Sequence, residues 1–337
     1  MDRILENKNF AHIYLEDALV DTKNVKQILL HFPNASIIPI RHYKDVFNRR
    51  HQSYMLQHQS QNLILAEKHG TLVYPGAPVC QSFGNRWFYY TSCVMNCVFD
   101  CEYCYLKGMY PSGNLVLFLN LEDIFKEVEA LLREHPVYLS VSYDTDLLAI
   151  ESFTGFVRRW TEFVAAHPDL TIEIRTKAAP ELLPAGLVPS DRSIFALTLS
   201  PDAVVSQYEH KTPALASRLS FAEKLLDACF PVRLCFDPML YYPGWRDGYS
   251  AMVDTVFKRL SPDSIRDVSV GSFRLSEEYL KVMRRNMPSS AVVQYPFVAD
   301  HGYYQYPPAR MEEMETFLVD KLSPYIGKEK IFRWKEQ

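Results

Sequence analysis

The sequence predicts an α/β fold, a partial TIM-type (β/α)6 barrel that runs from about residue 87 to residue 273. The first observation is a series of short, nearly all-apolar runs, which are typical of parallel strands that are buried on both faces. The second is that amphipathic segments with helical periodicity separate these runs, as the right-handed crossovers of a parallel sheet require. The third is that about six such units follow one another without a Gly/Ser linker, fewer than the eight of a closed barrel.

Each expected element follows from its own pattern. The strands are mostly apolar and cover residues 87–90, 137–142, 171–177, 193–200, 231–237 and 266–273. The helices are amphipathic and cover residues 121–135, 153–167, 214–229 and 249–260. Asn120 directly precedes the first helix and is expected to be its N-cap. Because the carboxyl ends of parallel strands meet at one edge of the sheet, we expect functional groups there.

Other segments flank this core. Residues 1–86 are expected to form an N-terminal extension that packs on the barrel of residues 87–310. Residues 311–337 are expected to form a C-terminal helix, which is acidic and amphipathic as far as Ile326, and a frayed tail after Gly327.

Composition and charge exclude several classes of protein. No apolar run approaches the roughly 20 residues of a membrane span, and the N-terminal residues carry charges where a signal peptide needs an apolar stretch. We therefore expect a cytoplasmic protein without a membrane partner. Lys and Arg number 36 against 40 Asp and Glu, so no global basic field indicates nucleic acid, and any contact with DNA must be local. The basic, aromatic-interleaved stretch RHYKDVFNRRH (41–51) is one such local feature.

Four of the seven cysteines lie between Cys93 and Cys104, which is unlike a secreted disulfide framework. Cys97, Cys101 and Cys104 form a CxxxCxxC pattern, and three thiolates from one loop can hold three irons of a four-iron cluster. Because such clusters usually have four cysteine ligands, the fourth iron would be open to a small molecule. A structural zinc site that adds Cys93, or a chance group of buried thiols, would be the alternative interpretation.

The three remaining cysteines show no such pattern. Cys229 and Cys235 lie in apolar helix and strand patterns, so we expect that they pack in the core. We expect core packing for Cys80 as well.

The cysteine loop, between a strand and a helix, resembles that of radical S-adenosylmethionine enzymes. The resemblance implies a [4Fe–4S] cluster at Cys97, Cys101 and Cys104 and S-adenosylmethionine as the second cofactor. It also implies that a 5′-deoxyadenosyl radical abstracts hydrogen from a substrate, with electrons from a reductant such as flavodoxin or ferredoxin.

Within that superfamily the chain is similar to the spore photoproduct lyase family, which repairs a thymine photoproduct in DNA. Five short segments carry the resemblance, namely CEYCYLKG (101–108), NLEDIF (120–125), RTK (175–177), TLSPD (198–202) and DPMLYYPGWRDGY (237–249). The resemblance therefore implies a radical S-adenosylmethionine lyase with DNA as its partner.

The resemblance also implies roles for individual residues. The positions that match the family's S-adenosylmethionine site are Tyr103, Thr145, Lys177, Thr198 and Asp237. The Lys177 ammonium at a strand end suits the methionine carboxylate, and Ser200 is a further candidate for a hydrogen bond to carboxylate or ribose. Tyr105 matches the tyrosine of the family's hydrogen-transfer relay.

Two positions depart from the family pattern. Tyr143 stands where the family has the cysteine that gives hydrogen to the thymine radical, and its phenolic O–H could serve instead. The aromatic segment FVADHGYYQYPPAR (297–310) replaces a basic hairpin, which removes positive charge that duplex binding uses.

These observations leave three functional hypotheses. The first is a lyase of the thymine photoproduct in which Tyr105 and Tyr143 return hydrogen. The second is a radical S-adenosylmethionine enzyme of the same family that acts on another nucleic-acid lesion, a nucleotide or another molecule. The third, from a different class, is a zinc-stabilised binding module.

Overall fold

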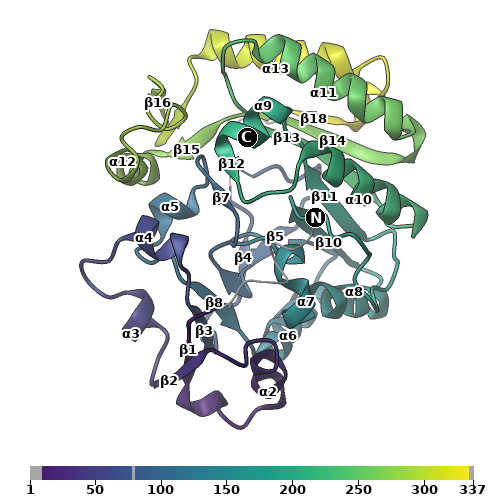
Figure 1. Ribbon diagram of the computed structural model, residues 1–337. Helices are drawn as coiled ribbons and strands as arrows, with labels where there is room; N and C mark the ends of the chain where they lie inside the picture. Colours follow the sequence, from purple (N-terminus) through teal and green to yellow (C-terminus); the bar gives the residue numbers. More distant parts are fainter. Residues whose placement is uncertain (1–9, 78–79, 334–337) are drawn as a thin grey trace.

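The computed structural model describes residues 10–77 and 80–333 and confirms the predicted parallel sheet (Figure 1). The predicted strands are neighbours in one eight-stranded sheet and run parallel. They are β5 (Phe88–Thr91), β9 (Val137–Ser140), β10 (Leu170–Thr176), β11 (Ser193–Thr198), β13 (Val232–Met239) and β14 (Ile265–Ser272). β4 (Val73–Pro75) adds an antiparallel strand at one edge and β18 (Ile331–Arg333) a parallel strand at the other, so the sheet stays open.

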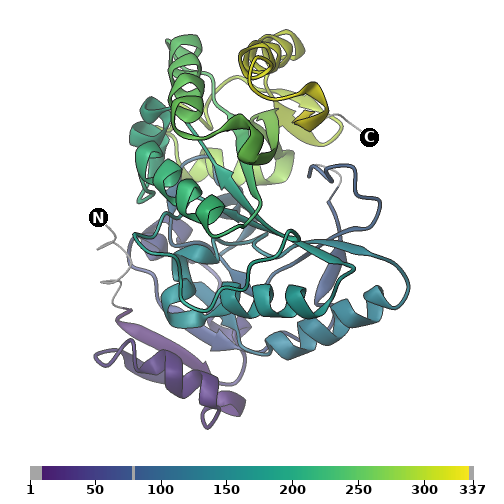
Figure 2. The ribbon, with the colours of Figure 1, turned by 90° about the vertical axis from the view of Figure 1, so that its right-hand side faces the viewer.

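The crossover helices lie along the outside of this sheet (Figures 1 and 2). They are α6 (Leu121–Leu132), α8 (Phe156–Ala166), α10 (Leu215–Asp227), α11 (Trp245–Arg259) and, from the C-terminal segment, α13 (Pro308–Leu322). Every residue of β9 and β11 is buried, because helices or loops cover both faces of the sheet. No described helix is long and apolar enough to cross a membrane.

Three local predictions were wrong. The helix expected over 153–167 is divided into α7 (Glu151–Thr154) and α8 by Gly155, whose φ of 63° ends the first helix in the left-handed region. Asn120 precedes α6 but does not cap it; its side chain accepts from the Lys68 N–H and donates to Asp123 instead. The tail expected to be frayed contains β18, where Arg333 pairs with Glu312 and Glu315 of α13; residues 334–337 of that tail lie outside the described residues.

Three strands of the N-terminal segment join two strands from beyond residue 86 in a second sheet that the sequence analysis did not predict. Its strand order is β2 (Ser36–Ile40), β1 (His12–Glu16), β3 (Leu63–Ala66), β8 (Leu115–Phe118) and β6 (Val94–Met95). The helices beside it are α2 (Lys23–Leu29), α3 (Lys44–Phe47), α4 (Tyr54–Gln59) and α5 (Leu106–Met109). The division of the chain at residue 86 stays a prediction.

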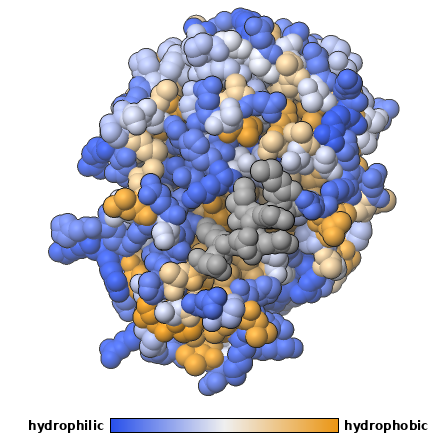
Figure 3. All heavy atoms as spheres, in the orientation of Figure 1, coloured by the Kyte–Doolittle hydropathy of each residue, from blue (hydrophilic) through white to orange (hydrophobic). Residues whose placement is uncertain are grey.

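Smaller elements complete the structure. β15 (Arg274–Ser276), β17 (Tyr303–Gln305) and β16 (Val298–Asp300) form an antiparallel sheet next to α12 (Glu277–Asn286). α9 (Asp202–Tyr208) leads into β12 (Glu209–His210), which pairs with β7 (Asp100–Cys101). Hydrophilic residues dominate the surface along the left edge of the molecule, on the side of α3 (Figure 3).

A buried glutamate at the start of α7 predicts a pH dependence of stability. Burial raises the pKa of Glu151 from 4.5 to about 7, although the backbone N–H groups of Val157 and Arg158 donate to its carboxylate and oppose the shift. The neutral form is therefore favoured by folding, and its stabilising contribution is lost as pH rises through about 7.

We expect Glu151→Gln to remove this dependence. Between about pH 5 and about pH 8 the free energy of unfolding of the wild type should fall by about 2.5 kcal/mol relative to that of the variant. Denaturant unfolding of both proteins at several pH values measures the difference. Parallel pH profiles would contradict the assignment.

Candidate active site

The carboxyl ends of the parallel strands surround one cavity of about 630 Å³. Almost all of the residues that the sequence analysis singled out line it together, namely Cys97, Cys101, Tyr103, Cys104, Tyr105, Tyr143, Thr145, Lys177, Thr198 and Asp237. Ser200 does not line it. The side chain of Ser200 is buried and donates a hydrogen bond of 2.8 Å to Glu209.

The cysteine loop between β5 and α5 is held from two sides. β7 within the loop pairs with β12, which fixes Cys101 against Glu209. On the other side, His58 and Gln61 each contact the carbonyl oxygen of Cys97 at 3.0 Å. The loop is therefore presented to the cavity by backbone contacts with segments far away in the sequence.

Three thiols of this loop, Cys97, Cys101 and Cys104, line the same cavity. Burial raises the pKa of Cys97, Cys101 and Cys104, so a strongly positive iron centre is what would hold them as thiolates. Three thiols facing one cavity therefore suit a [4Fe–4S] cluster with one open iron.

Cys93 is not part of this arrangement. Its side chain is fully buried, contacts Trp160 and does not line the cavity. The four-cysteine zinc site is thus not assembled, because Cys93 is in the core behind the loop.

We expect Cys93→Ala and Cys97→Ala to differ in iron content. The first should keep the brown absorption at about 400 nm after anaerobic reconstitution. The second should lose most of it, because Cys97 lines the cavity and Cys93 does not. Iron and sulfide analysis of both variants gives the measurement. Loss of the cluster from Cys93→Ala at unchanged fold would make Cys93 a ligand.

A buried polar network lies beside the loop. Glu209 accepts hydrogen bonds from the hydroxyls of Tyr103 and Ser200 and pairs with Arg218 at 2.5 Å. Burial opposes ionisation, but Arg218 and Lys177 outweigh it and hold the pKa of Glu209 below its ordinary value. Sequence reasoning missed Glu209, whose neighbours in the chain carry no recognisable motif.

Two features of this end of the cavity fit S-adenosylmethionine. The ammonium of Lys177 lies 5.5 Å from the centre of the Tyr103 ring, so a cation and an aromatic face meet there. The hydroxyl of Thr145 is buried and has no hydrogen-bond partner among the described residues, as expected of a group that awaits a ligand.

The opposite wall of the cavity contains a thiol that the sequence analysis placed in the core. The Cys80 sulfur donates to the Tyr143 hydroxyl at 3.7 Å, and both side chains line the cavity. Burial raises the pKa of Cys80, so the sulfur keeps its hydrogen at neutral pH. The prediction of core packing was therefore wrong for Cys80, and it was wrong for Cys229, which is exposed just after α10. It was confirmed for Cys235, which is fully buried.

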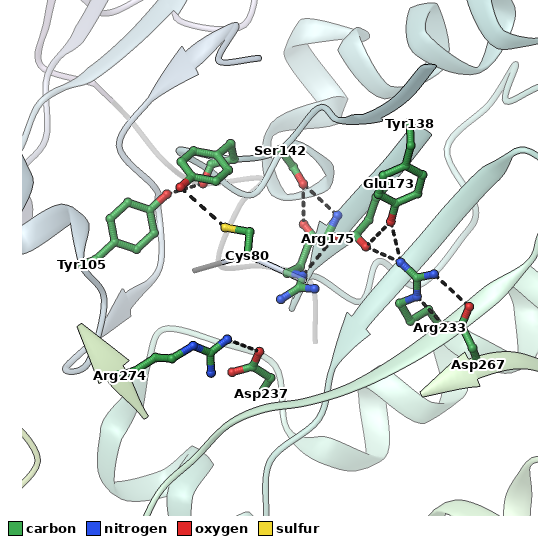
Figure 4. Close-up of polar contacts among 11 residues, drawn as sticks. Cys80, Tyr105, Tyr138, Ser142, Glu173, Arg175, Arg233, Asp237, Asp267 and Arg274 are labelled. Atoms are coloured by element: carbon green, nitrogen blue, oxygen red, sulfur yellow. Dashed lines mark hydrogen bonds and ion pairs between the residues drawn. The ribbon is translucent and has the colours of Figure 1, made fainter. Parts of the chain in front are cut away.

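Tyr105 reaches the same wall from the cysteine loop (Figure 4). Its hydroxyl donates to the Tyr143 carbonyl oxygen at 2.5 Å and lies 3.1 Å from a carboxylate oxygen of Asp144. The other oxygen of Asp144 accepts from the Ser92 hydroxyl. Burial raises the pKa of Asp144, and the three hydroxyls that donate to it, including that of Tyr110, act against this shift.

Two arginines add positive charge to the cavity (Figure 4). Arg274 pairs with Asp237 at 3.4 Å, and Arg175 contacts Glu173 at 3.2 Å. Both guanidinium groups belong to residues that line the cavity, and they suit an anionic or carbonyl-rich ligand.

Comparison with known proteins shows the family. The model of the family "Spore photoproduct lyase" matches residues 88–326. The chain is 22% identical over 250 residues to spore photoproduct lyase of Clostridium acetobutylicum, covering 70% of this chain and 73% of that protein. It is 23% identical over 202 residues to the enzyme of Bacillus subtilis, covering 58% of each.

Solved structures agree in fold. A cysteine-to-serine variant of spore photoproduct lyase superposes with a TM-score of 0.81 at 16% identity, covering 96% of this chain and 98% of that one. A double variant with bound AdoMet and dinucleoside spore photoproduct gives 0.79 at 17% identity, covering 97% and 99%. With the cysteine loop and the strand-end residues gathered at one cavity, the protein belongs to the spore photoproduct lyase family of radical S-adenosylmethionine enzymes.

Proposed function

We propose that this enzyme repairs the spore photoproduct in DNA, the substrate named for its relatives. The observation that carries the proposal is a set of hydrogen-bearing side chains, Cys80, Tyr143 and Tyr105, on the wall of the cavity that the three cysteines face. A radical repair reaction needs such groups to return hydrogen to its product. An electron donor such as flavodoxin or ferredoxin and a cytoplasmic location are part of the proposal.

The predicted cofactor residues have matching roles in it. Cys97, Cys101 and Cys104 would hold the [4Fe–4S] cluster, and Lys177 and Thr145 would hold S-adenosylmethionine. Tyr103, Thr198 and Asp237 are proposed for the same site, and Ser200 acts through Glu209. When bound, the two cofactors supply the 5′-deoxyadenosyl radical that removes a hydrogen atom from the lesion.

Cys80 is the proposed hydrogen donor. After the methylene bridge of the lesion breaks, the S–H bond of Cys80 breaks and its hydrogen atom goes to the thymine carbon radical, which leaves a thiyl radical on sulfur. The hydroxyl of Tyr143, 3.7 Å away, then returns a hydrogen atom to the sulfur. In this sequence of steps Tyr143 remains part of the relay, and the thiol of Cys80 transfers hydrogen to the carbon radical.

Tyr105 and Asp144 close the relay in this proposal. Tyr105 would hand its hydroxyl hydrogen to the Tyr143 oxygen radical, which leaves the unpaired electron on the Tyr105 oxygen, and the bound cofactor would supply the hydrogen atom that restores Tyr105. Asp144, 3.1 Å from the Tyr105 hydroxyl, orients that O–H bond and accepts its hydrogen bond. Asp144 is a positioning residue.

The release of 5′-deoxyadenosine by the reduced, reconstituted enzyme tests the function. We expect its release, and thymine formation, to rise when DNA that carries the spore photoproduct is added. Slow release that is indifferent to this DNA would reject the proposed substrate while retaining the radical machinery.

A further inference from the structure

We propose that a basic surface around α3 binds the phosphate backbone of the DNA that flanks the lesion. The surface consists of Arg41, Lys44, Arg49, Arg50 and His51, all of them exposed, and is called the α3 surface below. The inference rests on the proposed function, because it concerns how a duplex substrate reaches the cavity.

In the part of the chain that the structure describes, no ion pair to a carboxylate neutralises the charges of the α3 surface. Within the described residues, no carboxylate lies within ion-pair distance of Arg41, Lys44 or Arg50. Asp45 is the one acidic residue of the stretch 41–51, and its carboxylate accepts the backbone N–H of His42. The stretch 41–51 thus contains four cationic side chains and a single carboxylate.

Two arginines on the helices α8 and α11 differ from those of the α3 surface, because each has a carboxylate partner. Arg158 pairs with Glu162, and Arg246 with Glu313, each at 2.7 Å. In a chain with a net charge of −4, an uncompensated group of cations indicates an anionic partner rather than a uniformly charged surface.

The surface is rigidly placed. Val46 and Phe47 of α3 are buried, and the Phe47 ring packs edge-on against Tyr110 with centroids 5.4 Å apart. The Gln52 side chain donates to the carbonyl oxygens of Phe47 and Arg49 at 2.8 Å. A preordered backbone lowers the entropy that binding would cost.

A cavity of about 420 Å³ opens beside these cations. Arg49, Arg50 and His51 line it together with Gln57 and Asn114. Guanidinium and amide N–H groups are the donors that commonly contact DNA phosphates and sugars. This combination favours a sugar-phosphate backbone as the occupant.

The position of the surface suits a substrate that enters the active-site cavity. The α3 and α4 segment shares a hydrophobic cluster with α5, and Met109 at the end of α5 lines the active-site cavity. In Figure 3 the hydrophilic edge of the molecule lies on this side. A duplex with its lesion at the cavity would extend over α3.

The C-terminal segment does not supply the missing charge. In the aromatic segment 297–310 the only lysine or arginine is Arg310, which pairs with Glu313 at 2.7 Å. Because phosphate neutralisation provides most of the non-specific affinity for DNA, the charge must come from elsewhere. The α3 surface is the part of the described chain that we assign to this role.

The test compares two triple variants of the holoenzyme. Arg41→Gln, Lys44→Gln and Arg50→Gln remove charge from the α3 surface. Lys126→Gln, Arg158→Gln and Lys258→Gln remove the same charge from α6, α8 and α11 and serve as the control. Binding of damaged and undamaged duplexes is measured against salt concentration, and repair is measured on damaged duplex and on dinucleoside spore photoproduct.

We expect the α3 variant to bind both duplexes on the order of 100-fold more weakly at about 0.1 M salt, with a salt slope lower by about 2 to 3. Its repair of the dinucleoside, which has no flanking DNA, should equal that of the wild type. Duplex affinity and salt slope equal to those of the control would overturn the inference, as would a wild type that binds no DNA. If the wild type binds duplex through this surface but repairs neither substrate, the proposed function fails and the surface stands.

Discussion

Cys80→Ala is expected to lower the rate of thymine formation by about 100-fold or more while 5′-deoxyadenosine is still released. Removal of the thiol deletes the S–H bond that faces the cavity but leaves the three cluster cysteines and the Lys177 end unchanged. The thymine radical would then be quenched slowly and by other groups, so side products should accumulate. Product analysis by mass spectrometry measures both outcomes.

The position of the donor can be tested with deuterium and with a matched cysteine. In D2O the wild type should place deuterium in the methyl group of the repaired thymine, because S–H and O–H hydrogens exchange with solvent. Cys235→Ala removes a buried cysteine that does not line the cavity and should leave product formation unchanged. Wild-type repair by Cys80→Ala would remove Cys80 from the relay and make Tyr143 the donor.

Glu209→Gln is expected to destabilise the protein by about 3 to 5 kcal/mol. The glutamate and Arg218 are both fully buried, and a neutral amide leaves the guanidinium charge without a counter-charge. The Tyr103 and Ser200 hydroxyls also lose the carboxylate that accepts both of their hydrogen bonds. Because Glu209 belongs to β12, which pairs with Cys101 of β7, the substitution should loosen the cysteine loop as well. The free energy of unfolding in denaturant and the iron content after reconstitution should both decline.

Two controls separate this effect from general loss of charge. Glu313→Gln removes a partly exposed partner of Arg246 and should cost less than about 1 kcal/mol. The double variant Glu209→Leu with Arg218→Met removes both buried charges and should recover part of the lost stability. If Glu209→Gln is as stable as Glu313→Gln, the network does not support the loop as described.

The parallel sheet and its strand-end residues could be predicted because their signals are local. Apolar runs of four to eight residues mark strands whatever lies beside them, and each of the six expected strands was confirmed. The second sheet was not predicted, because its pairing joins strands that are far apart in the sequence: β3 pairs with β8, about 50 residues later. β6 has only two residues, which is too short to leave a periodic pattern.

The sequence by itself determined the family, the cysteine loop and the group of residues at the strand ends, because these depend on spacing along one stretch of chain. Only the tertiary structure decided that Cys80 lies against Tyr143, 63 residues away, and that Glu209 accepts the hydroxyl of Tyr103, 106 residues away. It also decided that Cys93, four residues before Cys97, faces the core. The physical reason is that burial and contact depend on which segments pack together. The residues next to a side chain in the sequence do not determine which distant segment it will contact.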